Sequence, residues 1–107
     1  MSEKPNYSKK KQLNLNEKID YPPYYDVILY NDNTTTFQFI HGILSVIFGK
    51  NEEESIAIGK KIHDEGHAVV GSYVKEIALT KQYFTNANSE NYKFPLNCVI
   101  EVSKQIK

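Results

Sequence analysis

The sequence predicts a small α+β domain, in which a three-stranded antiparallel sheet packs on three helices in the order β-α-α-β-α-β. With 107 residues, the chain is long enough for one domain at most. Segments rich in β-branched and aromatic residues alternate with segments whose apolar residues have helical spacing. Because these segments do not repeat as strict βαβ units, we expect the helices on one face of the sheet and solvent on the other.

The first predicted strand covers residues 25–30 (YDVILY), which are mostly aromatic or β-branched. A polar turn follows, and we expect a helix over residues 36–48. Thr35 and Gln38 have the spacing of a capping box at its start, and Gly49 ends it. This helix is apolar most of the way round, which predicts burial on more than one side.

The second helix is predicted by Asn51 and Glu54, which again have capping-box spacing. It should run to residue 65 and stop at Gly66. Four residues are expected on its inward face: Ser55, Ile58, Gly59 and Ile62. A strand over residues 67–74 (HAVVGSYV) follows.

A third helix, of weaker apolar periodicity, is expected over residues 75–88, with a loop from there to residue 93. Pro95 then opens the last strand. In that strand Leu96, Cys98 and Ile100 share one face, because side chains alternate along a strand.

Residues 1–22 are predicted to form a flexible N-terminal extension, and residues 23–107 the folded domain. The first twenty residues are rich in lysine and asparagine and have no sustained apolar period. Pro22 and Pro23 mark the entry to the domain.

The composition excludes several classes of protein. Thirteen lysines balance thirteen acidic residues and no arginine occurs, which argues against a nucleic-acid binder. No apolar run approaches the length of about 18 residues that a membrane span needs. The single cysteine excludes an internal disulfide framework, so we expect a reducing compartment, the bacterial cytoplasm.

One group of residues stands out as a candidate site. The polar segment 31–35 lies between a strand and an unusually apolar helix, and the second helix ends in Ile62 and His63. These segments would supply polar acceptors beside an apolar wall. The composition alone leaves two readings open, a ligand pocket or a capped turn over the core.

A metal site is a weaker candidate. His63 and His67, with Asp64 between them, would suit a small metal- or cofactor-dependent enzyme. Gly66 should break the helix that such a histidine pair requires, so we expect no metal and no cofactor. Cys98 lies on a predicted inward face, which favours a buried, inert thiol over a catalytic one.

Four segments resemble the ClpS family of N-degron (N-end rule) adaptor proteins. VILYNDNTTTFQFI, residues 27–40, is similar to the family's strand, Asn-Asp turn and following threonine. Residues 62–71 resemble its Val-His-x-x-Gly segment, residues 76–81 its Glu-x-x-x-Thr-Lys helix, and residues 95–98 its closing Pro-Leu strand. The four occur in order and at matching spacing over residues 23–101.

The resemblance implies an adaptor, not an enzyme. Members of the family bind substrates that begin with Leu, Phe, Tyr or Trp, and deliver them to a ClpA- or ClpC-type AAA+ unfoldase for proteolysis. We therefore expect N-degron proteins and the unfoldase's N-terminal domain as partners, no nucleic acid or membrane, and a monomer. The alternative is an interaction module that modulates the unfoldase without recognising N-degrons.

Carried over by resemblance, Asn31, Asp32 and His63 would hold the substrate's α-amino group. Asn33 and Thr35 would line the pocket mouth and touch the substrate backbone. The chemistry is suitable, because an α-amino group has a pKa near 7.7–8.0 and is mostly an ammonium with three donors at pH 7. A carboxylate, an amide oxygen and a neutral imidazole nitrogen are three acceptors.

The resemblance also implies a hydrophobic pocket and a docking surface. The pocket would receive the first side chain and be lined by Leu29, Phe37, Ile40, Gly59, Ile62 and Leu96. Glu76 and Lys81 match family positions that face the unfoldase, and we expect both to point outward. The N-terminal extension resembles one that engages the unfoldase.

Two departures from the family pattern concern specificity. Asn33 replaces a second aspartate, which puts discrimination at the second substrate residue in doubt. Gly59 replaces a methionine that helps to exclude branched side chains, and Phe37 replaces another. If Gly59 leaves room in the pocket, Ile and Val should also bind, more weakly than Leu or Phe. If it only lets two helices pack closely, the preference should be unaffected.

Overall fold

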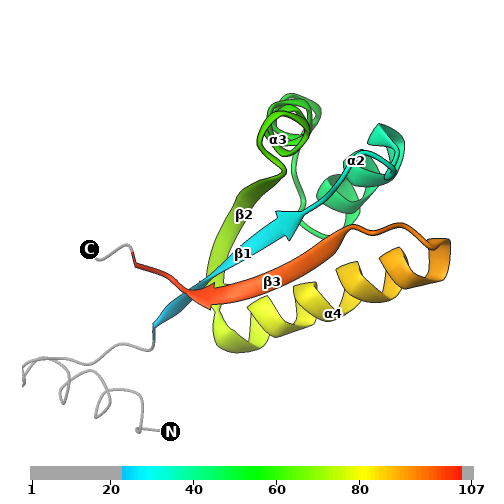
Figure 1. The fold of residues 1–107 in the computed structure, drawn as a ribbon. Helices are drawn as coiled ribbons and strands as arrows, with labels where there is room; N and C mark the ends of the chain where they lie inside the picture. Colours follow the sequence, from blue (N-terminus) through cyan, green and yellow to red (C-terminus); the bar gives the residue numbers. More distant parts are fainter. Residues whose placement is uncertain (1–22, 105–107) are drawn as a thin grey trace, which may run out of the picture.

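The computed structural model describes residues 23–104 as a three-stranded sheet with three helices (Figure 1). The elements in chain order are β1 (Tyr24–Tyr30), α2 (Phe37–Val46), α3 (Glu52–Glu65), β2 (His67–Val74), α4 (Lys75–Tyr92) and β3 (Asn97–Val102). The strand order is β2-β1-β3, with both pairings antiparallel. The predicted fold class is confirmed. The predicted N-terminal extension lies outside the described residues.

β1 is the central strand and organises the sheet. Its inward side chains Val27 and Leu29 are completely buried. α4 runs along one face of the sheet, while α2 and α3 lie together at the end where β1 finishes (Figure 1). The opposite face carries Tyr24, Tyr30 and Val69 with much of their surface in solvent. The expected solvated face is therefore present.

The core joins all six elements. Its largest aliphatic members come from β1, α2 and α3, and Ala78 brings α4 against them without any exposed surface. Burial of each large aliphatic side chain stabilises the fold by about 1.5–3 kcal/mol. The site described below is consequently held by helices that are anchored to the sheet.

The start of α2 differs from the prediction. Thr36, not Thr35, caps the helix, and its Oγ1 accepts a hydrogen bond from the Phe39 backbone N–H at 3.2 Å. The Thr35–Gln38 capping box is therefore wrong. Three consecutive threonines offer alternative caps, and Thr35 is buried instead. The helix ends at Val46, slightly earlier than expected.

The boundaries of α3 follow the sequence signals closely. Asn51 Oδ1 accepts from the Glu54 N–H at 2.8 Å, and a Glu54 carboxylate oxygen accepts from the Asn51 N–H at 3.0 Å. Gly66 ends the helix with φ of 88°, a left-handed conformation that glycine adopts without strain. The predicted capping box and helix end are confirmed.

α4 is longer than predicted, and the loop expected after residue 88 is wrong. The helix continues to Tyr92, where Ser89 is buried and the Tyr92 ring lies 5.4 Å from the ring of Phe39. Asn86 Oδ1 accepts from the Cys98 backbone N–H at 2.8 Å, and Asn86 Nδ2 donates to the Cys98 carbonyl at 3.1 Å. Gln82 donates to the same carbonyl at 3.1 Å. These bonds attach α4 to the edge strand β3.

Candidate functional site

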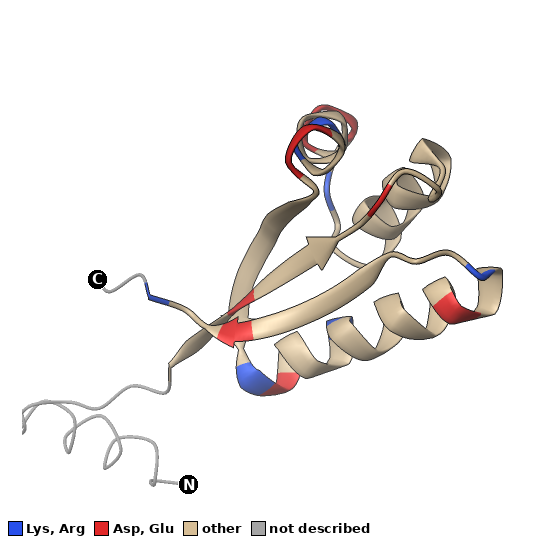
Figure 2. Cartoon of the chain, in the orientation of Figure 1, with Lys and Arg blue, Asp and Glu red and all other residues tan. Residues whose placement is uncertain are grey.

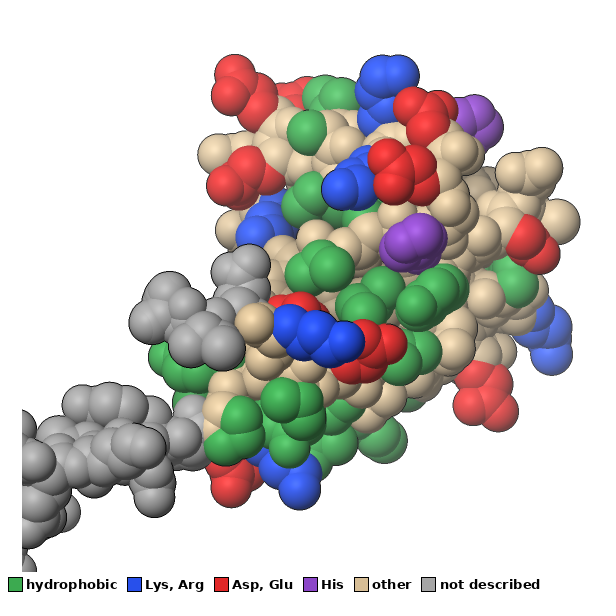
Figure 3. All heavy atoms as spheres, turned by 60° about the vertical axis from the view of Figure 1, so that its left-hand side comes forward, with side chains coloured by type: hydrophobic (Ala, Val, Ile, Leu, Met, Phe, Trp, Pro, Cys, Tyr) green, Lys and Arg blue, Asp and Glu red, His purple; other side chains and the backbone are tan. Residues whose placement is uncertain are grey.

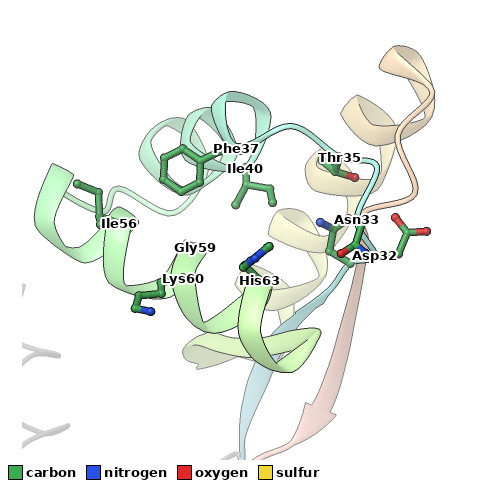
Figure 4. A pocket seen from close by; sticks show the side chains of 10 residues that line it. Asp32, Asn33, Thr35, Phe37, Ile40, Ile56, Gly59, Lys60 and His63 are labelled. Atoms are coloured by element: carbon green, nitrogen blue, oxygen red, sulfur yellow. The ribbon is translucent and has the colours of Figure 1, made fainter.

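A cavity of about 290 Å³ lies between α2, α3 and the loop that follows β1 (Figure 4). Its lining residues are Asn31, Asp32, Asn33, Thr35, Phe37, Ile40, Ile56, Gly59, Lys60 and His63. The loop supplies the polar residues at one end, and α2 with α3 supplies the apolar residues at the other. His63 lies between the two ends (Figure 4).

Backbone contacts place the loop against α3. The Asn31 N–H donates to the carbonyl of Gly66, the residue that ends α3, at 2.9 Å. This bond holds Asn31 close to the last turn of the helix, where His63 lies. The loop is fixed further on by Asp32, whose Oδ1 accepts from both the backbone N–H and the hydroxyl of Thr34 at 3.0 Å. The polar end of the cavity is thus built from local turn chemistry.

Two oxygen atoms at the polar end are buried without a hydrogen-bond partner among the described residues. They are Asn31 Oδ1 and Thr35 Oγ1. A buried polar group left unpaired costs about 1–3 kcal/mol, so proteins rarely keep one without a reason. Both atoms belong to residues that line the cavity. A ligand that donates hydrogen bonds would satisfy them.

The apolar end depends on close contact between Phe37 and Gly59. A Cβ atom at Gly59 would lie 2.7 Å from Phe37 Cε1, a separation too short for any side chain without movement of the ring. The ring therefore fills space beside Gly59, one of the two places where the sequence left open whether the pocket has extra room. Phe37 itself is about half exposed, so it lies at the rim of the cavity. Glycine is needed at position 59 for this packing.

Most of the predicted site residues lie together, but three do not line the cavity. Leu29, Ile62 and Leu96 are at most 3% exposed and belong to the core. Leu29 shares the inward face of β1 with Val27, and both are completely buried. The assignment of these three residues to the pocket lining is therefore corrected.

Two cavity residues were missed by the sequence reasoning. Ile56 and Lys60 precede His63 by seven and three residues on α3, a spacing that places all three on one side of the helix. This spacing from His63 is the signal in the sequence that could have predicted both residues. The side chain of Lys60 is 74% exposed, and it also lines the cavity rim.

The two predicted docking residues have different environments. Glu76 lies exposed in the first turn of α4. Lys81 is half-buried, and its Nζ donates to the Ile47 carbonyl at 2.7 Å. The same ammonium lies 5.6 Å from the Phe48 ring centroid and 5.3 Å from that of Tyr73. The expectation that Lys81 points freely outward is wrong, because α2 and β2 enclose its head group.

Other chemistry is limited in the described part of the chain. Cys98 is buried, and burial raises the pKa of its thiol to about 11, which disfavours the reactive thiolate. Within residues 23–104, no group of three or more His, Cys, Asp or Glu side chains could hold a metal ion. None of the helices in this range is long and apolar enough to cross a membrane.

The chain is similar to several known proteins. A family model described as "ATP-dependent Clp protease adaptor protein ClpS" matches residues 20–99. The ATP-dependent Clp protease adapter protein ClpS of Nautilia profundicola is 44% identical over 84 residues, covering 78% of this chain and 87% of that protein. Its counterpart in Lawsonia intracellularis is 40% identical over 90 residues, covering 84% and 83%.

A solved structure is also similar. Agrobacterium tumefaciens ClpS2 bound to L-phenylalaninamide has a TM-score of 0.74 and 29% sequence identity, covering 78% of this chain and 100% of that one. Because the family model spans well over half of the chain, the protein belongs to the ClpS family of Clp protease adaptors.

Proposed function

We propose that the protein binds polypeptides beginning with a large hydrophobic residue, through their free α-amino group, and delivers them to an AAA+ unfoldase for proteolysis. The observation that carries this proposal is the pair of unpaired buried oxygens, Asn31 Oδ1 and Thr35 Oγ1, at the polar end of a cavity whose other end is apolar. A hydrophobic N-terminal residue carries an ammonium and an apolar side chain on the same carbon atom, which suits those two ends.

The amine would be held by Asn31, Asp32 and His63. An α-ammonium has three donors and a positive charge, and these residues offer an amide oxygen, a carboxylate and a neutral imidazole nitrogen. Asn33 and Thr35 would contact the substrate backbone at the cavity mouth. An internal peptide nitrogen has one donor and no charge, so it would leave buried acceptors unpaired at a cost of about 1–3 kcal/mol each.

The first side chain would enter the apolar end, between Phe37, Ile40, Ile56 and Gly59. Burial of a Leu or Phe side chain contributes about 2–3 kcal/mol, comparable to the amine contacts. The ligand of the Agrobacterium structure, L-phenylalaninamide, combines a free amine with an aromatic side chain. It supports the same class of ligand here: substrates that begin with Leu, Phe, Tyr or Trp.

Delivery requires a second surface, which we place on the outer side of α4. Figure 2 shows the charged positions of this helix mainly at its two ends. Between them, Ile77, Leu79, Tyr83 and Phe84 are each 43–66% exposed, and Glu76 borders them. We propose that this surface meets the N-terminal domain of a ClpA- or ClpC-type unfoldase. Lys81 would act by fixing α4 against α2 through the Ile47 carbonyl.

Delivery can be tested with Glu76→Lys against the matched control Glu90→Lys, an exposed glutamate at the other end of the helix. We expect Glu76→Lys to reduce unfoldase-dependent degradation of a Leu-tagged substrate and to leave its peptide affinity unchanged. Equal degradation by the two variants would place the docking surface elsewhere. A parallel loss of peptide affinity would show that the two sites are not separate.

The alternative function is an interaction module that occupies the unfoldase without recognising N-degrons. Titration with a Leu-initiated peptide and its acetylated form distinguishes the two. The proposed function requires binding of the free peptide and loss of binding on acetylation, whereas the alternative predicts binding of neither. We expect this activity in the bacterial cytoplasm, with the adaptor as a monomer and without a cofactor.

A further inference from the structure

Lys60 introduces a positive charge at the rim of the cavity. It follows Gly59, which borders the apolar end, and precedes His63, which lies between the two ends. Figure 4 shows Lys60 on α3 beside Gly59, with His63 one turn further along the helix. Its position is therefore at the rim near the apolar end, where the first side chain of a bound substrate would lie.

The charges around the cavity leave this ammonium without a strong internal partner. Only two of the lining residues carry a full charge, Asp32 and Lys60. One oxygen of Asp32 already accepts two hydrogen bonds from Thr34. Asn33, at the mouth, is neutral. An acidic substrate side chain arriving here would meet one cation and little negative charge.

Lys60 forms a weak ion pair with Asp64, in which another carboxylate could take the place of Asp64. Its Nζ lies 3.3 Å from Asp64 Oδ2, one turn along α3, and the two side chains are 74% and 52% exposed. Acidic and basic side chains are mixed over α3, at the top of Figure 3. Exposed pairs of this kind stabilise proteins by less than about 1 kcal/mol. A substrate carboxylate could therefore replace Asp64 as the partner of Lys60 at little cost.

We infer that Lys60 is a specificity residue that favours an acidic side chain at the second position of the substrate. The inference rests on the proposed function, because it assumes that the amine lies near Asn31 and the first side chain near Gly59. It also assumes that the second residue of the substrate leaves the cavity past the part of the rim that Lys60 lines.

The test uses three peptides that begin with Leu-Asp, Leu-Asn or Leu-Lys and are otherwise identical. Their dissociation constants are measured by fluorescence anisotropy with the full chain. Wild type should bind Leu-Asp about two- to fivefold more tightly than Leu-Asn, the range for an exposed ion pair. Leu-Lys should bind most weakly. The preference should shrink in high salt, because screening weakens exposed pairs.

Three variants isolate the residue. Lys60→Met should bring the Leu-Asp to Leu-Asn ratio to about one. Lys61→Met makes the same change at the neighbouring exposed lysine, which does not line the cavity, and should keep the wild-type ratio. Asp64→Asn removes the competing carboxylate and should increase the preference. Binding of Leu-Asn shows in each case that the variant is folded.

The outcomes separate the two proposals. If wild type binds Leu-Asn only with a free amine but does not distinguish it from Leu-Asp, this inference is overturned and the proposed function stands. An acidic preference that survives Lys60→Met also overturns it. If acetylation has no effect on Leu-Asn binding, the proposed function fails and the inference fails with it.

Discussion

The loop after β1 and the middle of α4 each contain an asparagine, and the two differ in whether the side-chain oxygen has a hydrogen-bond partner. Asn86 on α4 uses both its oxygen and its nitrogen on the backbone of Cys98. Asn31 in the loop has a buried side-chain oxygen without a partner in the described structure. The side chain of Asn86 stabilises the fold, whereas that of Asn31 is one that the proposed ligand would engage. Ser55, Thr85 and Ser89 also have buried hydroxyl oxygens without a partner among the described residues, but none of them lines the cavity, whereas Asn31 does.

The largest effect expected from this comparison is on stability. Asn86→Ala removes the acceptor of the Cys98 N–H and leaves that buried group unpaired, while Gln82 still serves the Cys98 carbonyl. We expect a loss of about 1–3 kcal/mol in the free energy of unfolding, measured by urea denaturation. The exposed Asn91 on the same helix gives the matched control Asn91→Ala, which should be nearly neutral. Equal stability of the two variants would show that the hydrogen bonds from Asn86 to β3 contribute little to folding.

The converse effect is expected at the loop. Asn31→Ala, Asp32→Ala and His63→Ala should each weaken a Leu-initiated peptide at least tenfold, or about 1.4 kcal/mol, because each removes an acceptor for the ammonium. Since Asn31 Oδ1 makes no bond within the described chain, Asn31→Ala should leave the unfolding free energy nearly unchanged. Calorimetric titration measures the peptide affinity, and denaturation measures the unfolding free energy. A variant that loses stability but not affinity would contradict the assignment.

A smaller effect concerns pH and the strand that Asn86 holds. Burial raises the pKa of Cys98 from 9.0 to about 11, so the folded state keeps the thiol proton more firmly than the unfolded state does. The resulting stabilisation is complete below pH 9 and is lost as the pH rises through about 11. Cys98→Ala should therefore flatten the alkaline decline of the unfolding free energy. An identical decline in both proteins would contradict this.

The smallest expected effect is on the choice of first residue. Wild type should bind Ile and Val peptides more weakly than Leu, by roughly 1 kcal/mol or fivefold, the value of a methylene or two. A side chain at position 59 would displace the Phe37 ring. Gly59→Met should therefore lose the binding of Ile and Val peptides and keep that of Leu peptides. Adding Phe37→Ala to the Gly59→Met protein should restore the binding of Ile and Val peptides. A drop in thermal stability with unchanged preference would instead assign Gly59 to helix packing.

Local sequence signals predicted the parts of the fold that local chemistry builds. Asn51, Glu54 and Gly66 carry their own capping bonds and conformation, and α3 has the predicted boundaries. The end of α4 was missed because Ser89 and Asn91 are poor helix formers, while the burial of Ser89 and the contact of Tyr92 with Phe39 are tertiary features. Such contacts join residues far apart in the sequence and leave no periodic pattern.

The candidate site likewise contains residues that the sequence predicted and residues that it did not. The loop residues and His63 were predicted through a family resemblance, and the fold does bring them to one cavity. Leu29 and Ile62 were misplaced because an apolar residue beside a pocket and one facing the core look alike in sequence. Lys60 was missed because a long side chain can line a rim with its stem while its head group remains in solvent.

The attachment of α4 to β3 has a consequence for a protein that handles other polypeptides. β3 is an edge strand, and a free edge offers a row of backbone groups on which any extended chain can form a further strand. Asn86 and Gln82 occupy the peptide groups of Cys98 on that edge. Extended segments of a client chain are thereby denied pairing at this point, whatever their first residue. Under the proposed function, discrimination between clients is then left to the cavity that would bind the N-terminus.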